Sequence, residues 1–296
     1  MSARVDKELL RRIRRLEIVT RKAVNEALAG QYHSRFKGHG IAFAEVRPYQ
    51  PGDEVRRIDW NVSARTGELF VKVFHEEREL TVMLLVDVSA SSEFGSGGRS
   101  KSETAAQVAA QIALSAVADG DRVGLVLFTD VVEKVVPPKK GRKHALRILA
   151  DILSHQPTGQ GTDLTVGLDA LLLAQRRTAV VFLLSDFLAE RYEKTLKVVA
   201  RKHDLVPVVI TDPVEAELPD TGLFALEDPE TGHKFLVDTS DPRVRQRYWH
   251  WLRDGVESRA RLFRRLHLDS LDVRTDEDNG DALARLFHRR GRRGHA

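Results

Sequence analysis

Three oxygen-bearing side chains follow a short apolar run in the first third of the chain. Asp87, Ser89 and Ser91 alternate along the loop directly after residues 82–86, which are all apolar. An apolar run of this length is typical of a buried strand, and side chains spaced two apart just beyond it can converge on one point. One carboxylate and two hydroxyls form a hard donor set without sulfur or imidazole. The expected ion is therefore Mg²⁺, with Mn²⁺ or Ca²⁺ as alternatives, rather than zinc.

Two further loops offer oxygen ligands. The apolar run 178–184 leads into Ser185 and Asp186, and the Gly-rich loop 159–163 presents Thr162 ahead of a predicted helix. Sites in open parallel α/β sheets lie in loops at the carboxyl ends of strands. For a single loop, the alternative is that Asp and Ser only cap a turn or a helix. Three compatible loops favour a metal site, with the predicted ligands Asp87, Ser89, Ser91, Thr162 and Asp186.

Apolar strands and amphipathic helices alternate from residue 81 onward. Continuous Val, Ile and Leu runs between helices indicate a sheet that is covered on both faces. The predicted fold class is α/β, with a doubly wound, mainly parallel sheet flanked by helices. Strands are expected at 81–86, 122–128, 131–136, 178–184 and 205–210, and helices at 100–117, 143–153, 164–174 and 192–201.

The segments on either side of this region have other patterns. Residues 6–29 carry apolar side chains at helical spacing among many Arg, which predicts a helix that packs on its own domain or binds a membrane surface or partner. Residues 31–80 read as a small β-rich subdomain. Beyond 212 we expect a hairpin at 224–226 and 234–237, a helix at 241–266, an edge strand at 268–274 and a helix at 281–287. The apolar stripe of the helix 241–266 is formed by Trp249, Leu252, Val256, Ala260 and Phe263.

These patterns predict three regions. Residues 1–80 hold the N-terminal helix and the β-rich subdomain, and residues 81–212 form the α/β domain with the metal site. Residues 213–296 supply a hairpin and helices that pack on that domain, followed by a basic tail.

The three oxygen-bearing loops resemble the metal-ion-dependent adhesion site of von Willebrand factor type A domains. In that family the first loop is Asp-x-Ser-x-Ser, the second contributes a Thr and the third an Asp. The resemblance implies that Ser89 and Ser91 ligate the ion through their hydroxyls and that Thr162 ligates directly or through water. It also implies that Asp87 and Asp186 hold coordinating waters and balance charge. A carboxylate of a partner protein would then complete the coordination.

A second resemblance covers nearly the whole chain. The pattern Arg47-Pro48-Tyr49-x-Pro51-Gly52-Asp53-x-Val55-Arg56-x-Ile58-Asp59-Trp60, followed by Ser63-Ala64-Arg65 and Val71-Lys72, is similar to the signature of the DUF58 family. These are bacterial proteins with a von Willebrand A-like domain, typically encoded beside MoxR-type AAA+ ATPases. The resemblance implies such an ATPase as partner. Within the signature, Asp59 could pair with Arg56, Arg57 or Arg65 and Trp60 could take an Arg across its face, as a scaffold or as a contact surface.

The composition of the chain limits the cellular compartments and the classes of partner that are expected. The chain has 296 residues and no cysteine, which excludes disulfides and thiolate chemistry and fits a reducing compartment. No apolar run approaches the ~18 residues that span a bilayer, so a cytoplasmic protein without a transmembrane segment is expected. Residues 1–36 and 285–296 each carry a net charge of +5, while residues 37–284 carry −6. An acidic body makes nucleic acid an unlikely partner, although the basic ends could bind an anionic surface weakly.

The sequence favours a binding module over an enzyme. An aspartyl phosphotransferase needs a second carboxylate two residues after the first, and here that position is Ser89. Neither a Gly-x-Ser-x-Gly elbow nor a Walker A loop is present. The predicted function is metal-ion-dependent protein–protein interaction, as an adaptor in the assembly or maturation of a protein complex with the ATPase. A Mg²⁺- or Mn²⁺-dependent phosphohydrolase is the alternative.

Overall fold

The structure is a computed structural model that describes residues 11, 13, 14, 42–75, 79–159, 161–216, 218, 220–227, 233–279 and 282–286. The chain divides into two compact units, Lys37–Leu80 and the remainder, and each is described by itself. The helix predicted over residues 6–29 and the Arg-rich tail lie almost wholly outside the described residues, although Arg11, Ile13 and Arg14 are helical.

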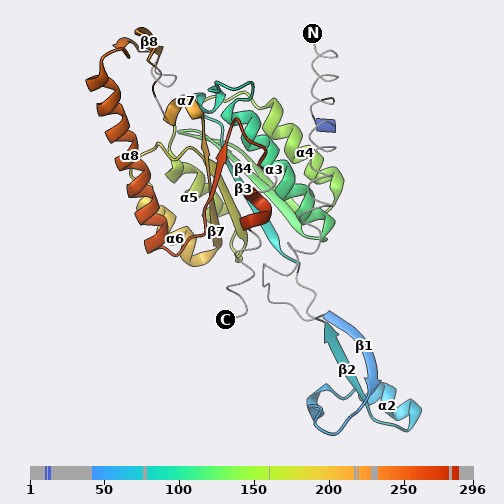
Figure 1. Cartoon of the computed structure of the whole chain (residues 1–296). Coiled ribbons are helices and arrows are strands. Elements are labelled where there is room, and N and C mark those ends of the chain that lie inside the picture. Colours follow the sequence, from blue (N-terminus) through green and yellow to red (C-terminus); the bar gives the residue numbers. More distant parts are fainter. Residues whose placement is uncertain are drawn as a thin grey trace. The chain divides into compact units, whose positions relative to one another are not determined.

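A six-stranded sheet forms the centre of the larger unit, in the order β10-β7-β6-β3-β4-β5 (Figure 1). All neighbouring strands are parallel except β5, which runs antiparallel to β4. The predicted fold class is therefore confirmed. The strands are β3 (Thr81–Asp87), β4 (Arg122–Phe128), β5 (Val132–Lys139), β6 (Val180–Ser185), β7 (Asp204–Thr211) and β10 (Leu271–Arg274).

The central strand β3 fixes the place where a site can form. From β3 the chain builds outward through β4 and β5 on one side, then returns to build β6, β7 and β10 on the other. The strand order thus reverses between β3 and β6, and crevices for ligands open at the carboxyl ends of such a pair. Val86 lies opposite Leu184 in this pair, so the loops after both strands emerge at the same edge.

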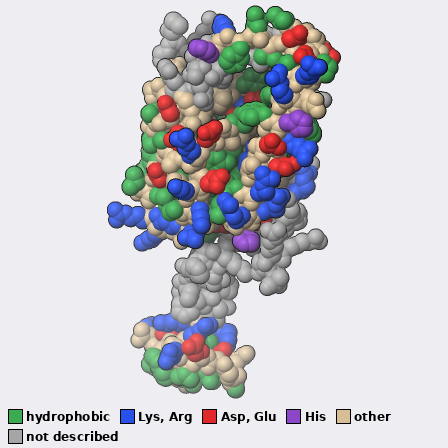
Figure 2. All heavy atoms as spheres, turned by 90° about the vertical axis from the view of Figure 1, so that its left-hand side faces the viewer, with side chains coloured by type: hydrophobic (Ala, Val, Ile, Leu, Met, Phe, Trp, Pro, Cys, Tyr) green, Lys and Arg blue, Asp and Glu red, His purple; other side chains and the backbone are tan. Residues whose placement is uncertain are grey.

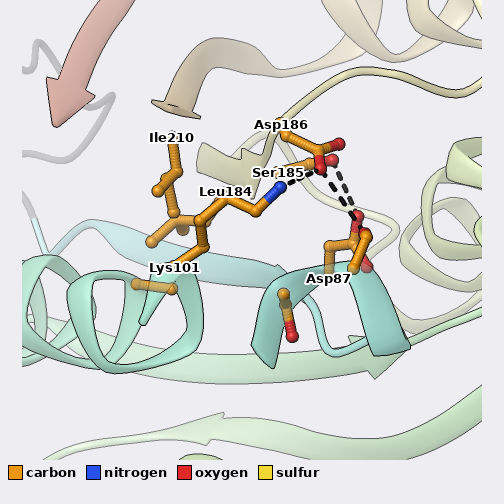
Figure 3. A pocket seen from close by; sticks show the side chains of 9 residues that line it. Asp87, Lys101, Leu184, Ser185, Asp186 and Ile210 are labelled. Carbon is orange, nitrogen blue, oxygen red and sulfur yellow. Dashed lines mark hydrogen bonds and ion pairs between the residues drawn. The ribbon is translucent and has the colours of Figure 1, made fainter. Parts of the chain in front are cut away.

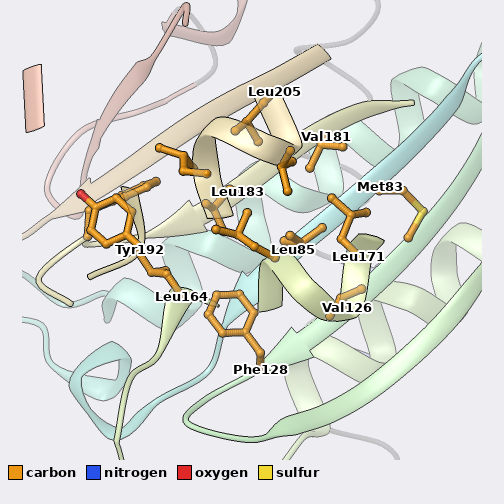
Figure 4. Close-up of a cluster of buried hydrophobic side chains, with 14 of the residues drawn as sticks. Met83, Leu85, Val126, Phe128, Leu164, Leu171, Val181, Leu183, Tyr192 and Leu205 are labelled. Carbon is orange, nitrogen blue, oxygen red and sulfur yellow. The ribbon is translucent and has the colours of Figure 1, made fainter. Parts of the chain in front are cut away.

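Helices cover both faces of the sheet. One face carries α3 (Lys101–Ala118) and α4 (Arg142–Ser154), and the other carries α5 (Leu164–Ala174) and α6 (Glu193–Lys202) (Figure 1). Figure 4 shows the core under α5 and α6, where Met83, Leu85 and Val181 of the strands meet side chains of the helices. These side chains are fully buried because both faces of the sheet are covered. A capping box starts α3, because the Ser100 side chain accepts from Glu103 N and the Glu103 side chain accepts from Ser100 N.

The edge strand β5 corrects one predicted boundary. We expected the strand to end before Pro137 and Pro138, but β5 runs through both prolines to Lys139. An edge strand tolerates proline because only one of its sides donates to a neighbour.

The helix α8 (Pro242–Arg265) corrects a predicted packing face. Its position matches the expected helix, with Asp241 as the N-cap. Of the predicted apolar stripe only Phe263 is buried, together with its neighbour Leu262. Trp249 is 47% exposed and Val256 is 42% exposed. The helix reaches the core only at its C-terminal end.

The rest of the C-terminal region includes a hairpin and the last strand of the main sheet. The predicted hairpin is present as β8 (Leu223–Glu227) and β9 (Lys234–Asp238), and the short helix α7 (Pro213–Ala216) precedes it. The predicted edge strand is β10, paired in parallel with β7. Residues 282–286 are helical, within the predicted range 281–287. Among the helices that the structure describes, none is long and apolar enough to cross a membrane.

The small unit is a two-stranded antiparallel sheet with a helical connection. Its elements are β1 (Ala42–Pro48), η2 (Val55–Arg57), α2 (Trp60–Thr66) and β2 (Phe70–His75). The bidentate pair of this unit joins Arg47 to Asp53, at 2.6 and 2.7 Å, across the turn that contains Gly52. Two signature residues therefore hold the turn after β1.

The pairing expected for Asp59 is wrong. Its carboxylate caps α2 by accepting from the backbone N–H groups of Asn61 and Val62, and it lies 3.7 Å from Lys72 rather than beside an Arg. Trp60 is the first residue of the helix and is 63% exposed. Asp59 thus acts as the N-cap of α2. It stands directly before Trp60, the first helical residue, where a carboxylate can accept from the free backbone N–H groups of the first turn.

Candidate functional site

The loops that follow β3 and β6 meet at the reversal point of the sheet. In the first loop the short turn η3 (Ala90–Glu93) places Ser91 near the strand end. Ser91 Oγ lies 3.1 Å from Ser89 Oγ and 3.4 Å from Oδ2 of Asp186 in the second loop. Asp87 joins the two loops because its Oδ2 accepts from Ser185 Oγ at 2.8 Å. The structure therefore brings together four of the five predicted ligands: Asp87, Ser89, Ser91 and Asp186.

Each of the two aspartates uses one oxygen for its own loop and the other for the cluster. Asp87 Oδ1 accepts from Ser89 N at 3.0 Å, and Asp186 Oδ1 accepts from Leu188 N at 3.1 Å. These local bonds are the turn-capping role that a lone Asp would have. The Oδ2 atoms of both aspartates face the other loop, and capping a turn does not require this contact. Each aspartate therefore caps its own loop and also contributes to a site that the two loops share.

A buried lysine that the sequence analysis did not identify lies beside Asp186. Lys101 is 2% exposed, and its Nζ donates to Asp186 Oδ2 at 2.8 Å and to Glu215 Oε1 of α7 at 2.7 Å. Figure 3 shows this amine reaching Asp186 beside Asp87. Burial opposes its charge, but the carboxylates of Asp186 and Glu215 outweigh burial and raise the pKa of Lys101. The available signal was its place in the first turn of α3, where the helix dipole disfavours a cation unless acids face it.

The site holds more negative charge than Lys101 neutralises. Burial, and then the nearby charge of Asp186, raise the pKa of Asp87 to about 6, although hydrogen bonds from Ser89 and Ser185 favour the carboxylate. Both aspartates are buried, at 5% and 8% exposed. A cation placed between them would therefore stabilise charges that the protein alone leaves only partly balanced.

The residues present fit a hard divalent ion. They offer two hydroxyls and the free oxygens of two carboxylates, which is the oxygen chemistry that Mg²⁺ and Mn²⁺ select. Among the described residues there is no group of three or more His, Cys, Asp or Glu that could hold a metal. Hydroxyls, water and an outside ligand would have to supply the remaining positions. The small pocket at this point is lined by Asp87, Ser91, Ser92, Lys101, Ala105, Leu184, Ser185, Asp186 and Ile210.

Thr162 lies on a third loop, beside the carboxyl end of β4. Asp163 N donates to the carbonyl oxygen of Thr129, and a Cβ on Gly159 would collide with the Thr129 and Asp130 side chains. Glycine is therefore required for the close approach of this loop to β4. Thr162 is half-buried and does not line the pocket described above. The third predicted loop thus approaches from the β4 side of β3, opposite to Asp186.

Glu133 of β5 fixes the loop that carries Thr162. Its carboxylate accepts from Thr158 N and Oγ1, from Gly159 N and from Thr129 Oγ1, at 2.8 to 3.0 Å, and it lies 3.1 Å from His155 Nε2. Burial opposes the charge, but the hydrogen bonds outweigh it and lower the pKa of Glu133 to about 2. The sequence analysis missed this residue, and the only signal was a single acid within an otherwise apolar and basic edge strand.

Comparison with known proteins places these features in a family. Residues 45–257 match the family described as "Protein of unknown function DUF58". The protein Rv1480 of Mycobacterium tuberculosis is 33% identical over 278 residues, which cover 92% of this chain and 87% of that protein. The protein YeaD of Bacillus subtilis is 34% identical over 115 residues, which cover 38% of this chain and 27% of that protein. Both relatives are described as uncharacterized.

Solved structures with low sequence identity were also found. BatB from Bacteroides thetaiotaomicron is 18% identical with a TM-score of 0.44, and the match covers 72% of this chain and 99% of that one. The VWA domain of SpRpn10 is 13% identical with a TM-score of 0.38, and the match covers 71% of this chain and 95% of that one.

Proposed function

The chain belongs to the DUF58 family, and from this premise we propose that its α/β domain is a metal-ion-dependent protein-interaction module that captures a carboxylate of a partner protein. One observation carries the proposal. Asp87, Ser89, Ser91 and Asp186 come from two loops 95 or more residues apart and meet in a single hydrogen-bonded cluster. They meet at the reversal point of the sheet, where α/β proteins bind ligands.

The residues divide the work of holding the ion. Ser89 and Ser91 would ligate it, Asp87 and Asp186 would balance its charge and hold water, and Thr162 would approach from the third loop. A bound Mg²⁺ would supply an electrophilic position that an incoming carboxylate can occupy. Lys101 orients Asp186 by donating to the oxygen that also faces Ser91.

The proposed role is binding rather than catalysis. A metal-dependent phosphotransferase would need an acidic nucleophile and a second carboxylate at the position of Ser89. That position holds a hydroxyl whose hydrogen-bond partner is Ser91, and Ser89 is fully buried. The geometry thus supports capture of an anionic group more than formation of a bond to it.

The proposed partner is a MoxR-type AAA+ ATPase, and the proposed setting is assembly or maturation of a protein complex. Support for this step comes from the DUF58 signature in the small unit, where Arg47, Asp53 and Asp59 hold the backbone and Val55 and Trp60 are left exposed. The client would offer the carboxylate to the ion.

Titration of the full chain with Mn²⁺ in a calorimeter tests the metal site. We expect one site on the wild type and at least a tenfold loss of affinity, about 1.4 kcal/mol or more, in Asp87→Ala and Ser89→Ala. Asp169→Ala, at an exposed position of α5, is the matched control and should bind like the wild type. A wild type that binds no Mn²⁺, or an Asp87→Ala variant that binds it equally well, would disprove the site.

Capture of the ATPase tests the partner separately. Immobilised wild-type protein should retain the purified MoxR-type ATPase of the same genome in Mg²⁺ and release it in EDTA. The Asp87→Ala variant should fail to retain it while its circular dichroism stays that of the wild type. If the ATPase is retained equally well in EDTA and by the Asp87→Ala variant, the proposed mechanism is contradicted, even if the ion binds.

A further inference from the structure

The helix α8 leaves most of its length without a covering layer. Of its 24 residues only Leu262 and Phe263, near the C-terminal end, are buried. The N-terminal two thirds carries large apolar side chains that face water. Trp249 is 47% exposed, Val256 is 42% exposed, and Leu252 between them is half-buried. Large apolar side chains gathered on one exposed element mark interaction sites in soluble domains.

These three residues form a continuous seam. Their spacing of three and four residues puts Trp249, Leu252 and Val256 on one side of the helix, as the a and d positions of a helix pair are. The same side continues through Ala260 to Phe263, which enters the core. We call Trp249, Leu252 and Val256 the α8 seam. Its spacing matches what a second helix packing alongside would bury.

Residues that flank the α8 seam hold this part of the helix on the domain. Tyr248 Oη donates to the carbonyl of Glu215 at 2.6 Å, and Arg259 donates to the carbonyl of Asp186 at 3.2 Å. Arg253 lies over the Trp249 ring, with its guanidinium 5.2 Å from the ring centroid. A helix fixed in this way offers a preformed surface, and a partner would lose less entropy on docking there. Trp and Arg are also the residues most enriched at energetically dominant contact sites.

Charge indicates which occupant fits. The helix α8 carries eight Arg and two acids, Asp254 and Glu257, so it is strongly basic. Residues 1–36 and 285–296 of the same chain each carry a net charge of +5 and would be repelled. A second copy of α8 would be repelled for the same reason. Charge therefore favours an acidic helix as the occupant, and neither basic terminus nor a second α8 supplies one. Figure 2 looks onto this side of the molecule, where basic, acidic and hydrophobic side chains are interspersed.

We propose that the α8 seam is a docking site for an amphipathic helix of a partner protein whose flanking residues are acidic. The apolar side of that helix would cover Trp249, Leu252 and Val256, and its acids would meet Arg253 and the neighbouring arginines of α8. This mode of recognition buries an apolar face in a groove and reads charge at its rim. It involves none of the predicted metal ligands, so it is separate from the proposed capture of a carboxylate.

A displayed library of 20-residue helical peptides, selected on the full-length protein in EDTA, supplies the probe. We expect the enriched peptides to combine an apolar face with Asp and Glu at its edges. Binding of the strongest synthetic peptide is then measured by fluorescence anisotropy. Trp249→Ala and Arg253→Glu should each weaken binding at least tenfold. Asp87→Ala should bind like the wild type, since the seam does not depend on the metal site.

Trp251→Ala is the matched control. Trp251 is 61% exposed on the same helix but lies on a different side, two residues from Trp249. Its loss should change affinity by less than about twofold. The proposal is overturned if Trp251→Ala loses as much affinity as Trp249→Ala, or if the enriched peptides lack acidic residues. It is also overturned if the wild type enriches no peptides beyond those that the Trp249→Ala variant enriches. Tighter binding of a 20-nucleotide DNA or of phosphatidylserine vesicles than of any peptide, lost in Arg253→Glu, would instead assign the helix to a polyanion.

Discussion

Lys101 shows how one buried side chain can decide the charge of a site. Its ammonium lies between Asp186 and Glu215, and removal of one partner of a buried ion pair leaves the other charge without compensation. We predict that Lys101→Met lowers the free energy of unfolding by about 3 kcal/mol, less than a fully buried pair would lose, because Glu215 is partly exposed. Urea denaturation without divalent ions measures this change. The control is Lys197→Met, at an exposed position of α6.

The same variant links stability to the proposed ion. A ligand that binds only the folded state stabilises it by an amount that grows with the logarithm of its concentration relative to its Kd. With one positive charge removed, Mg²⁺ should stabilise Lys101→Met more than it stabilises the wild type. If Mg²⁺ raises the stability of both proteins equally, Lys101 and the ion do not share Asp186.

His203 makes stability depend on pH at a distance from the site. The ring is 3% exposed, and neither nitrogen has a hydrogen-bond partner among the residues that the structure describes. Burial, and then the charge of Lys202, lower its pKa to about 4, below the ordinary 6.5 of the unfolded chain. The unfolded state therefore binds more protons between these two values, so stability is intact above pH 6.5 and falls as the pH drops toward 4.

We predict that the wild type loses about 2 kcal/mol between pH 7.5 and pH 5 through this residue. His203→Leu should remove that part of the loss, as measured by urea denaturation at the two pH values. His250→Leu, on the exposed surface of α8, should keep it. An unchanged pH dependence in His203→Leu would show that the acid sensitivity has another source.

At the scale of elements, Glu133 joins the edge strand β5 to the loop of Thr162. Four hydrogen bonds converge on one carboxylate, and an amide cannot accept all of them. Glu133→Gln should lower the free energy of unfolding by about 2 kcal/mol at pH 7. Because the folded pKa is about 2 and the unfolded value is 4.5, this contribution is present above pH 4.5 and is lost on acidification toward pH 2.

Urea denaturation at pH 7 and pH 3 tests whether the loss of stability in Glu133→Gln comes from the charge of the carboxylate. The difference between wild type and variant should shrink at pH 3. Glu190→Gln, an exposed change in the loop after β6, should match the wild type at both values. A difference that persists unchanged at pH 3 would mean that the carboxylate charge is not what holds the loop.

The elements were predictable where local pattern and burial agree. Apolar runs located β3, β6 and β7, because this signal acts over a few residues. The burial of the α8 stripe was not predictable, because periodicity shows that a helix has an apolar side but not how much of that side is covered. Lys101 and Glu133 were missed because their partners lie up to 114 residues away along the chain. Side-chain pairing over such distances depends on the fold, which a single sequence does not show.

At the scale of the whole molecule, the fold extends beyond the segment that matches the family. That match ends at residue 257, whereas Leu262 and Phe263 belong to the buried core. The strand β10 then pairs along β7, and Leu271 and Val273 are buried. Leu283 and Leu286 are also buried. A chain that stops near residue 257 would expose β7 as an unprotected edge and uncover part of the core.

We therefore predict opposite outcomes for two truncations. A chain ending at residue 257 should lose its cooperative urea transition, because the loss of six buried apolar side chains removes about 9–18 kcal/mol, which is comparable with the roughly 5–15 kcal/mol that stabilises an ordinary domain. A chain ending at Leu286 keeps all of those side chains and should unfold with the midpoint of the full chain. It also lacks four of the five arginines of the basic tail. If the shorter chain unfolded cooperatively near the wild-type midpoint, the C-terminal strand and helices would be accessory to the fold. Retention of the strongest α8 peptide by the Leu286 chain would further show that the seam binds without the tail.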